Sequence, residues 1–429
     1  MATDTHRAIE TVWKLEAPKL IAGLTRIVRD IALAEDLAHD ALVAALEQWP
    51  TDGIPRNPAA WLMAAAKHRA IDQLRRRTRL ERTHEELARE GKAGRSVDEP
   101  GRDAALDDDD LNDDLLRLIF IACHPVLSVE AQVALTLRLL GGLTTDEIAR
   151  GFLVPEPTIA QRIVRAKRTL AKNQVPFEVP RGADRAARLS SVLRVLYLIF
   201  NEGYTATAGD EWARPSLCEE ALRVGRILAE LAPDEPEVHG LVGLMEIQAS
   251  RLRARVDASG RPILLPDQNR ALWDPLLIRR GLAAIRRAEL LGRPHGPYVL
   301  QASIAACHAR TVDGDRTDWN RIVSLYDALV AVAPSPVVSL NRAVAVGMAS
   351  GPQAGLDAIE QLSDQPQLRN YHLLASVRGD LLVKVGRPDE ARGEFERAAA
   401  LTRNARERQL LLIRAMECAA SPGASRSEV

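Results

Sequence analysis

The 429-residue sequence has little cysteine, little net charge and no long apolar run, and each scarcity argues against a class of protein. A formal net charge of -1 gives no global basic field, so any nucleic-acid surface has to be local. No stretch approaches the roughly 18 uninterrupted apolar residues of a membrane span, and the N-terminus has no signal-peptide pattern. Four widely spaced cysteines without a CxxC pair favour small core residues in a reducing cytoplasm: Cys123, Cys218, Cys307 and Cys418. We therefore expect a cytoplasmic protein without a membrane partner.

Motifs of common enzymes are also missing. The chain has no nucleophile motif, no phosphate-binding glycine loop and no HExxH. The Cys123-His124 and Cys307-His308 pairs have no second pair at ligand spacing, which argues against zinc. We expect no catalytic residue, no metal and no cofactor.

What the chain does contain predicts an all-α protein of two to four domains. Its 46% hydrophobic and 27% charged residues are typical of a soluble globular protein. Closely spaced helical patterns fill residues 8–82, and helix-forming Ala, Leu, Arg and Glu dominate after Asp184.

The segment from Thr144 to Lys172 predicts a helix-turn-helix. Thr144 and Glu147 have the spacing of a capping box, Gly151 is expected at the turn, and Pro157 suits the first turn of a second helix. The buried stripe of that helix is predicted to be Ile159, Ile163, Ala166 and Leu170. The opposite face can reach base edges and phosphates through Thr158, Gln161, Arg162, Arg165, Arg168, Thr169 and Lys172. The alternative is a solvated basic face on an ordinary helical hairpin.

Two N-terminal helices flank a break at Thr51 to Pro58. Before it, Asp36, Asp40 and Glu47 form an acidic stripe, for which a solvated face is the alternative. After it, a basic run suited to phosphates lies beside Trp61, which is either an unstacking platform or a core residue. That run is Lys67, Arg69, Arg75, Arg76, Arg77, Arg79 and Arg82.

An acidic stretch from Asp98 to Asp114 is expected to stay solvated. We interpret residues 83–114 as a linker. A mimic of nucleic acid that competes for the basic run is the alternative to a simple tether.

The order of these segments resembles the extracytoplasmic-function (ECF) sigma factors over roughly residues 8–172. The resemblance is carried by Glu35-Asp36-Leu37, by Asn57-Pro58 through Trp61-Leu62 to Asp72-Gln73-Leu74-Arg75-Arg76, and by the helix-turn-helix. It implies a sigma region 2 domain at 8–82 and a region 4 domain at 115–172. This sequence departs from the family in having Pro157 to Arg162 where Gly-Thr-Val-Lys-Ser-Arg is frequent, and Leu42 where Phe is common.

The resemblance also implies partners, namely the clamp coiled coil of core RNA polymerase and promoter DNA. Core polymerase would meet Glu35, Asp36 and Asp40, and the loop from Thr51 to Asn57 would receive a flipped base. Side chains implied at the minus-ten element are Asn57, Trp61, Lys67, Arg69, Arg75, Arg76 and Arg77. Those implied at the minus-thirty-five element are Thr158, Gln161, Arg162, Arg165 and Arg168.

Residues 184–420 form an extension with the spacing of helical repeats. Tetratricopeptide-repeat (TPR) offsets occur at Gly379, Leu382, Gly386, Ala391, Phe395 and Ala398, and a copy 36 residues upstream at Ala343, Val346, Gly355, Ile359 and Leu362. Tyr326 and Pro334 suggest a third copy, and Gly243 is expected to open an earlier helix. The extension resembles that of ECF factors with a C-terminal TPR-like domain and an NEGY motif, here Asn201 to Tyr204. The resemblance implies that the TPR-like domain contributes to activity.

Two segments of the extension suggest either a pocket for a protein or small-molecule partner, or loops closed by internal contacts. They are the loop expected at Phe200 to Tyr204 and the hairpin expected at Ala254 to Asp274, where Trp273 would fill the core. The leading hypothesis is an alternative sigma factor without its own catalytic site. A one-component regulator, whose repeats sense a ligand, is the alternative; the acidic helix and the basic run argue against it.

Overall fold

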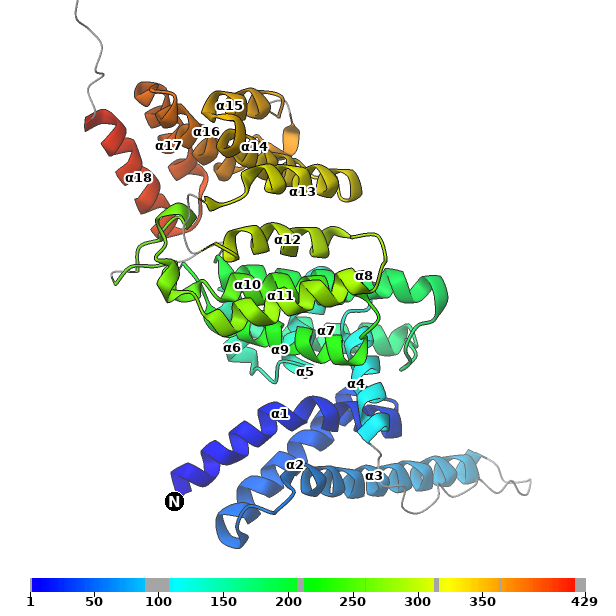
Figure 1. The fold of residues 1–429 in the computed structure, drawn as a ribbon. Coiled ribbons are helices and arrows are strands. Elements are labelled where there is room, and N and C mark those ends of the chain that lie inside the picture. The colour runs from blue at the N-terminus through cyan, green and yellow to red at the C-terminus, as the bar shows by residue number, and fades with distance from the viewer. Residues whose placement is uncertain are drawn as a thin grey trace, which may run out of the picture. The chain divides into compact units, whose positions relative to one another are not determined.

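The computed structural model describes residues 2–88, 108–206, 212–258, 260–311, 316–362 and 365–420. The chain divides into two compact units, Met1–Val195 and Leu196–Val429. In the described ranges the regular elements are helices, apart from one isolated antiparallel bridge between Val256 and Pro262 (Figure 1). The expected all-α fold is confirmed.

Three helices begin the first unit: α1 (Ala2–Val28), α2 (Ile31–Asp52) and α3 (Pro58–Ala88). Asp30 caps α2 by accepting hydrogen bonds from the backbone N–H groups of Ala32 and Leu33. The three helices pack against one another, and their buried faces form a core that includes Leu24, Leu37 and Leu62. The break between α2 and α3 is shorter than expected, because α2 continues through Thr51 and Asp52 before Gly53 turns the chain at φ 85°.

Four further helices follow in the same unit: α4 (Asp108–Ala122), α5 (Val129–Leu139), α6 (Thr145–Phe152) and α7 (Glu156–Lys172). The predicted linker 83–114 therefore overlaps α3 at residues 83–88 and α4 at residues 108–114, and residues 89–107 lie outside the described part. The expectation that the acidic stretch stays solvated is wrong for Asp114, which is fully buried. Arg26 of α1 lies 2.9 Å from its carboxylate and Arg117 pairs with it, so two cations compensate the buried charge.

Helix α8 (Gly182–Tyr204) crosses the division between the units. Its first half contacts the first unit: Ser191 donates to the carbonyl oxygen of Cys123 at 3.0 Å, and Arg188 donates to that of Phe120 at 3.3 Å. Gln132, which is fully buried, also donates to the Cys123 and His124 carbonyls. The region expected to begin at residue 184 thus starts inside a helix that also completes the first unit.

The second unit continues as consecutive helices that pack against their neighbours in sequence (Figure 1). They are α9 (Pro215–Leu231), α10 (Pro236–Ala249), α11 (Pro275–Leu290), α12 (Pro297–Ala309), α13 (Trp319–Val332), α14 (Pro336–Ser350), α15 (Pro352–Glu360), α16 (His372–Lys384), α17 (Pro388–Leu401) and α18 (Ala405–Ala420). Short 3-10 turns lie between α10 and α11, at Leu252–Ala254, Leu265–Asp267 and Arg270–Leu272, and before α16, at Pro366–Leu368. This arrangement is a helical-repeat region.

The 36-residue offset predicted from sequence corresponds to equivalent packing positions. Gly355 of α15 and Ala391 of α17 are buried, as are Ile359 and Phe395 one turn later in the same helices. Ala343 of α14 is buried too, and these helices share one hydrophobic cluster with Leu374, Leu382 and Leu411. Stacking therefore buries a face that one pair alone would leave exposed.

Gly243 does not open a helix, contrary to expectation. It lies in the middle of α10, where a Cβ atom would be 3.1 Å from the carbonyl oxygen of Gly281 on α11. The approach is equally close from the other helix: a Cβ atom on Gly281 would lie 3.0 Å from the carbonyl oxygen of Gly243. The two glycines let the backbones of α10 and α11 approach each other.

Candidate nucleic-acid interface

The capping box that starts α6 is confirmed. The Glu147 N–H donates to Thr144 Oγ1 at 3.1 Å, and the Thr144 N–H donates to Glu147 Oε2 at 2.8 Å. The turn differs from the prediction, because Gly151 is buried inside α6 and Leu153 takes the left-handed conformation at φ 50°. Its N–H bonds to the Ala149 and Arg150 carbonyls, which ends α6 without a glycine.

Helix α7 has the predicted amphipathic division. Ile159, Ile163, Ala166 and Leu170 are its buried residues. Among the predicted DNA-binding side chains, Gln161, Arg165 and Arg168 are exposed, whereas Thr158 and Arg162 are half-buried. Thr158, Gln161 and Arg162 lie in the first two turns of α7, where a helix in the major groove contacts base edges.

Of the residues predicted to contact the minus-ten element, Asn57 directly precedes α3 and the others lie on α3. Asn57 is exposed and caps α3, with its Oδ1 accepting from the Ala60 N–H at 3.0 Å. Trp61 is half-buried, and its ring meets the buried Trp49 ring edge-on at a centroid distance of 5.4 Å. Trp61 therefore packs against the core while keeping part of its ring accessible.

The basic residues of α3 become more exposed toward its C-terminal end. Lys67 and Arg69 are half-buried, whereas Arg75 and Arg76 are exposed. The side chains of Arg77, Arg79 and Arg82 lie outside the described residues.

An acidic face is present on α2. Asp36, Asp40 and Glu47 are exposed, and Val43 lies between them with 51% of its surface exposed. Their spacing of i, i+4, i+7 and i+11 places them along one side of the helix. An apolar side chain flanked by carboxylates suits a protein partner better than a phosphate backbone.

Glu35 departs from this acidic face. It is only 5% exposed, with Arg138 Nε of α5 2.6 Å from Oε1 and Lys167 Nζ of α7 paired with Oε2. Arg138 also contacts His39 Nε2 at 3.1 Å and donates to the Leu143 carbonyl oxygen at 3.2 Å. Burial raises the pKa of Glu35, but Lys167 and Arg138 outweigh it, so the pKa lies below its ordinary value.

In this conformation Glu35 is not available to a partner, unlike Asp36 and Asp40. The helical period carried a signal of this, because Glu35 lies one turn from Ile31 and three residues before Ala38, both of them buried. Sequence reasoning missed its partners Arg138 and Lys167 altogether.

The NEGY segment is helical, not a loop, since α8 runs through Tyr204. Its glycine is required by contact with α9: a Cβ on Gly203 would lie 2.7 Å from the Cys218 backbone nitrogen. Glu202 pairs with Arg214. The Tyr204 ring stacks with the Phe200 ring at a centroid distance of 5.8 Å, and the Arg255 guanidinium lies 3.5 Å from the Tyr204 centroid. These contacts support a structural role for the segment.

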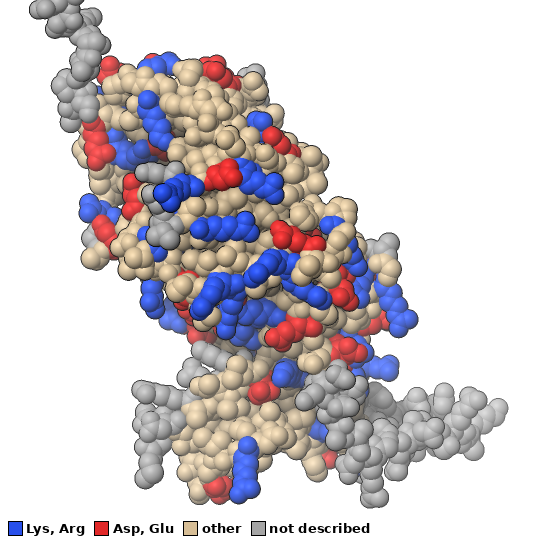
Figure 2. All heavy atoms as spheres, in the orientation of Figure 1, with Lys and Arg blue, Asp and Glu red and all other residues tan. Residues whose placement is uncertain are grey.

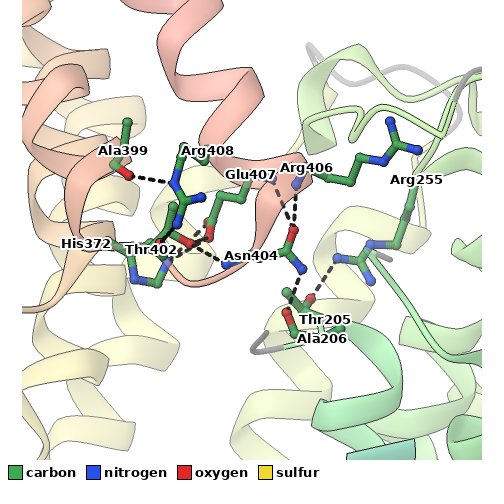
Figure 3. Close-up of polar contacts among 10 residues, drawn as sticks. All are labelled: Thr205, Ala206, Arg255, His372, Ala399, Thr402, Asn404, Arg406, Glu407 and Arg408. Atoms are coloured by element: carbon green, nitrogen blue, oxygen red, sulfur yellow. Dashed lines mark hydrogen bonds and ion pairs between the residues drawn. The ribbon is translucent and has the colours of Figure 1, made fainter. Parts of the chain in front are cut away.

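The end of α8 is held by two buried side chains from distant segments (Figure 3). Arg255 donates to the Tyr204 carbonyl and, at 2.8 Å, to the Thr205 hydroxyl. Asn404, which is 1% exposed, donates to the Ala206 carbonyl at 3.0 Å and caps α18 through its side-chain oxygen. The start of the repeat region and its last helix are thus tied together within the second unit.

The Ala254 to Asp274 segment contains the expected turn. Gly260 has φ 79°, and the Asp257 N–H donates to the Arg261 carbonyl at 2.9 Å. Trp273 is 5% exposed, as expected of a core residue, and Arg270 donates to the His308 and Thr311 carbonyls. The hairpin and α18 also line an open hollow of about 330 Å³ that carries three acidic and three basic side chains: Asp257, Asp267, Glu417, Arg261, Arg406 and Arg414.

The described residues lack two further kinds of feature. None of the helices seen there is long and apolar enough to span a membrane. That same portion of the chain holds no cluster of three or more His, Cys, Asp or Glu side chains placed to bind a metal. All four cysteines are buried and free, and burial raises the pKa of Cys123 and of Cys218 to about 12.

Comparison with known proteins matches both domains of the first unit. Sigma-70 region 2 matches residues 13–80, Sigma-70, region 4, matches residues 117–170, and a family of unknown function (DUF6596) matches residues 188–289. An uncharacterized protein of Rhizobium meliloti (strain 1021) is 44% identical over 405 residues, covering 94% of each chain. The crystal structure of yeast Tom70 is similar at 12% identity and a TM-score of 0.30 over 97% of this chain and 86% of that one, which is too distant to assign a fold.

The two matched domains define the class: the protein is a sigma-70-type factor, a specificity subunit whose partners are core RNA polymerase and promoter DNA. Within that class, the chain belongs to the same family as the Rhizobium meliloti protein. Because the similarity covers 94% of both chains, the helical extension belongs to this family together with the two sigma-70 domains.

Proposed function

We propose that this sigma-70-type factor is an alternative sigma factor of the ECF group, acting in the cytoplasm, with a TPR-like extension that contributes to its activity. The observation that carries the proposal is the pairing of an exposed acidic face on α2 with a capped helix-turn-helix whose second helix exposes Gln161, Arg165 and Arg168. A one-component regulator would need the helix-turn-helix but not the acidic face on α2.

In this proposal, Asp36, Val43 and Asp40 of α2 form the docking face for the polymerase clamp. Exposed carboxylates select a basic partner and speed its encounter, while the half-exposed Val43 adds apolar contact. Glu35 joins this face only after leaving Arg138 and Lys167.

DNA contacts are divided between two helices. Arg75 and Arg76 of α3 hold phosphates near the minus-ten element, and the accessible part of Trp61 offers a stacking surface beside the Asn57 loop. Helix α7 contacts the minus-thirty-five element through Thr158, Gln161 and Arg162, with Arg165 and Arg168 on phosphates.

The extension is proposed to support the factor, not to mask it. An inhibitor that covered DNA-binding arginines would present a concentrated acidic face. Basic and acidic side chains are instead interspersed over α9 to α18 on the face drawn in Figure 2, and many are paired, as in Arg342 with Asp327 at 2.6 Å and Arg392 with Glu396 at 2.9 Å. A protein or small molecule that binds the repeats is also proposed, with the hollow beside α18 as one place for it.

Run-off transcription with purified core polymerase tests the proposal. The wild-type chain should direct transcription from a cognate promoter, and Asp36→Arg with Asp40→Arg should weaken core binding at least about tenfold, which is about 1.4 kcal/mol. Both carboxylates are exposed, so the fold should survive. Glu219→Arg with Glu230→Arg, two exposed acids of α9, is the control with the same charge change. Unchanged core binding by the α2 variant would count against the sigma docking assignment.

A further inference from the structure

The exposed side of α11 carries a set of arginines that lies outside both sigma-70 domains. Gly281, Ile285 and Ala288 are the buried residues of this helix, and Gly281 packs against Gly243 of α10. This packing determines which side of α11 faces solvent. The helix contains four arginines and a single acid, Glu289, and all four arginines are exposed: Arg279, Arg280, Arg286 and Arg287. Figure 2 shows basic side chains gathered where Figure 1 draws α11.

Nearby acids compensate only part of this positive charge. Arg287 lies 3.8 Å from Asp234, and Arg293, just beyond the helix, lies 3.4 Å from Glu235. Both acids belong to the α9–α10 connection, so they reach only the C-terminal end of the set. In the described part of the chain, three arginines of α11 take part in no ion pair: Arg279, Arg280 and Arg286.

The centre of this surface suits a phosphate backbone better than a protein. Ala283 lies between the two arginine pairs, and Leu276 and Leu290 lie seven residues to either side of it. Seven residues of helix span about 10 Å, so these apolar side chains form no continuous patch. The core of a protein interface is depleted of charge, whereas the guanidinium fork matches phosphate oxygens with two parallel hydrogen bonds. Charge and chemistry therefore both favour DNA.

We infer that Arg279, Arg280, Arg286 and Arg287 form a third DNA-binding surface, here called the α11 surface, which contacts promoter phosphates without reading sequence. This inference goes beyond the proposed function, which places the DNA contacts on α3 and α7 alone. The same chain carries both sigma-70 domains, so DNA held by them is at a high effective concentration for α11. Even weak phosphate contacts would then strengthen the promoter complex.

Binding titrations of the full chain at several salt concentrations test the α11 surface. The probe is a labelled duplex of mixed sequence, several helical turns long. Arg279→Gln, Arg280→Gln and Arg286→Gln are combined in one variant, which removes three positive charges. Because the logarithm of affinity falls with that of salt by about 0.9 per phosphate contact, the slope should become shallower by roughly 1–3. A change of about one in slope is a tenfold change in affinity per tenfold change in salt.

Two control variants separate phosphate contact from net charge and from folding. Arg342→Gln, Arg387→Gln and Arg392→Gln together remove the same charge from arginines that already pair with Asp327, Glu390 and Glu396. This matched control should keep the wild-type slope. Lysine at all three α11 positions should keep most of the slope, because the release of counterions depends on charge. Circular dichroism should show unchanged helix content in every variant.

A photo-crosslinker tests direct contact with DNA. Cysteine in place of Ala283, at the centre of the α11 surface, carries the crosslinker, because the four native cysteines are buried. Cysteine in place of Ala328, an exposed residue of α13 beside Asp327, is the control position. We expect crosslinks to the duplex from Ala283→Cys well above those from Ala328→Cys, and their loss at high salt.

Several outcomes would show that this surface does not bind DNA. Equal salt slopes for the α11 glutamine variant and its matched control would overturn the inference, and so would equal crosslinking from the two cysteine positions. If the α11 variant keeps its slope but loses affinity for core polymerase, the surface binds an acidic protein instead. Arg165→Gln with Arg168→Gln tests the α7 assignment separately, so an unchanged slope there would count against the proposed function and leave the α11 result standing.

Discussion

Replacing Gly379 with alanine should destabilise the repeat region, although alanine is the better helix former. Gly379 is a buried residue of α16, and a Cβ atom there would lie 2.7 Å from Cε1, 2.9 Å from Cδ1 and 3.0 Å from Cζ of Phe395 on α17. The Phe395 ring is 1% exposed, and the Arg414 guanidinium lies 4.4 Å from its centroid on another helix. The ring therefore has little room to move away from an added methyl group.

The magnitude follows from two opposing effects. Alanine in place of glycine in a helix interior stabilises by roughly 0.5–1 kcal/mol, whereas overpacking a core costs roughly 1–3 kcal/mol. We expect a net loss of about 1–2 kcal/mol. Gly393 of α17 is the matched control, because nothing lies within 4 Å of its would-be Cβ. Gly393→Ala should stabilise by up to about 1 kcal/mol.

Thermal unfolding of the full chain measures the difference. For a unit of this size, a change of 1 kcal/mol shifts the Tm by roughly 2–4 °C, so the two glycine variants should move the Tm of the second unit in opposite directions. Phe395→Leu should recover part of the loss when combined with Gly379→Ala. Equal stability of the Gly379→Ala and Gly393→Ala chains would show that α16 and α17 do not approach as described.

Three other predictions concern DNA binding, pH and truncation. Loss of Arg162 should cost about 1–3 kcal/mol and relax preference at one promoter position, whereas loss of Arg76 should weaken all sequences and reduce the salt slope by about one; binding titrations over several salt concentrations distinguish them. Burial, with Arg251 and Arg270 nearby, lowers the pKa of His308 from 6.5 to about 4. Only the unfolded chain binds that proton between these values, so stability should fall by up to roughly 3 kcal/mol as pH drops from about 6.5 to about 4, and denaturant titrations should show a smaller fall in His308→Gln. Truncation after Pro180 should yield a less stable fragment than truncation after Tyr204, because it removes the α8 contacts to Phe120 and Cys123; similar melting of the two fragments would contradict this.

Features encoded by local pattern were predictable from sequence. The Thr144–Glu147 box and the buried stripe from Ile159 to Leu170 depend on residues three or four positions apart, where periodicity and capping chemistry operate directly. The 36-residue repeat was visible because paired helices need small residues at fixed positions, as at Gly355 and Ala391.

Features that depend on distant partners were not predictable. Glu35 is separated from Arg138 by 103 residues and from Lys167 by 132, and nothing in the local pattern of α2 identifies either cation. Asp114 belongs to a run whose composition favours solvent, yet Arg26 makes its burial tolerable. The left-handed Leu153 was missed for a different reason, since a nearby glycine looked like the better turn residue.

The position of α8 bears on how the extension could act. Within the first unit, the early residues of α8 bond to α4 and the α4–α5 connection. Its last residues are fixed by Arg255 and Asn404 from far along the chain. A ligand that altered the packing around Tyr204 would therefore disturb the contacts of Arg255 and Asn404, and with them the attachment of α18 to the first helix of the second unit.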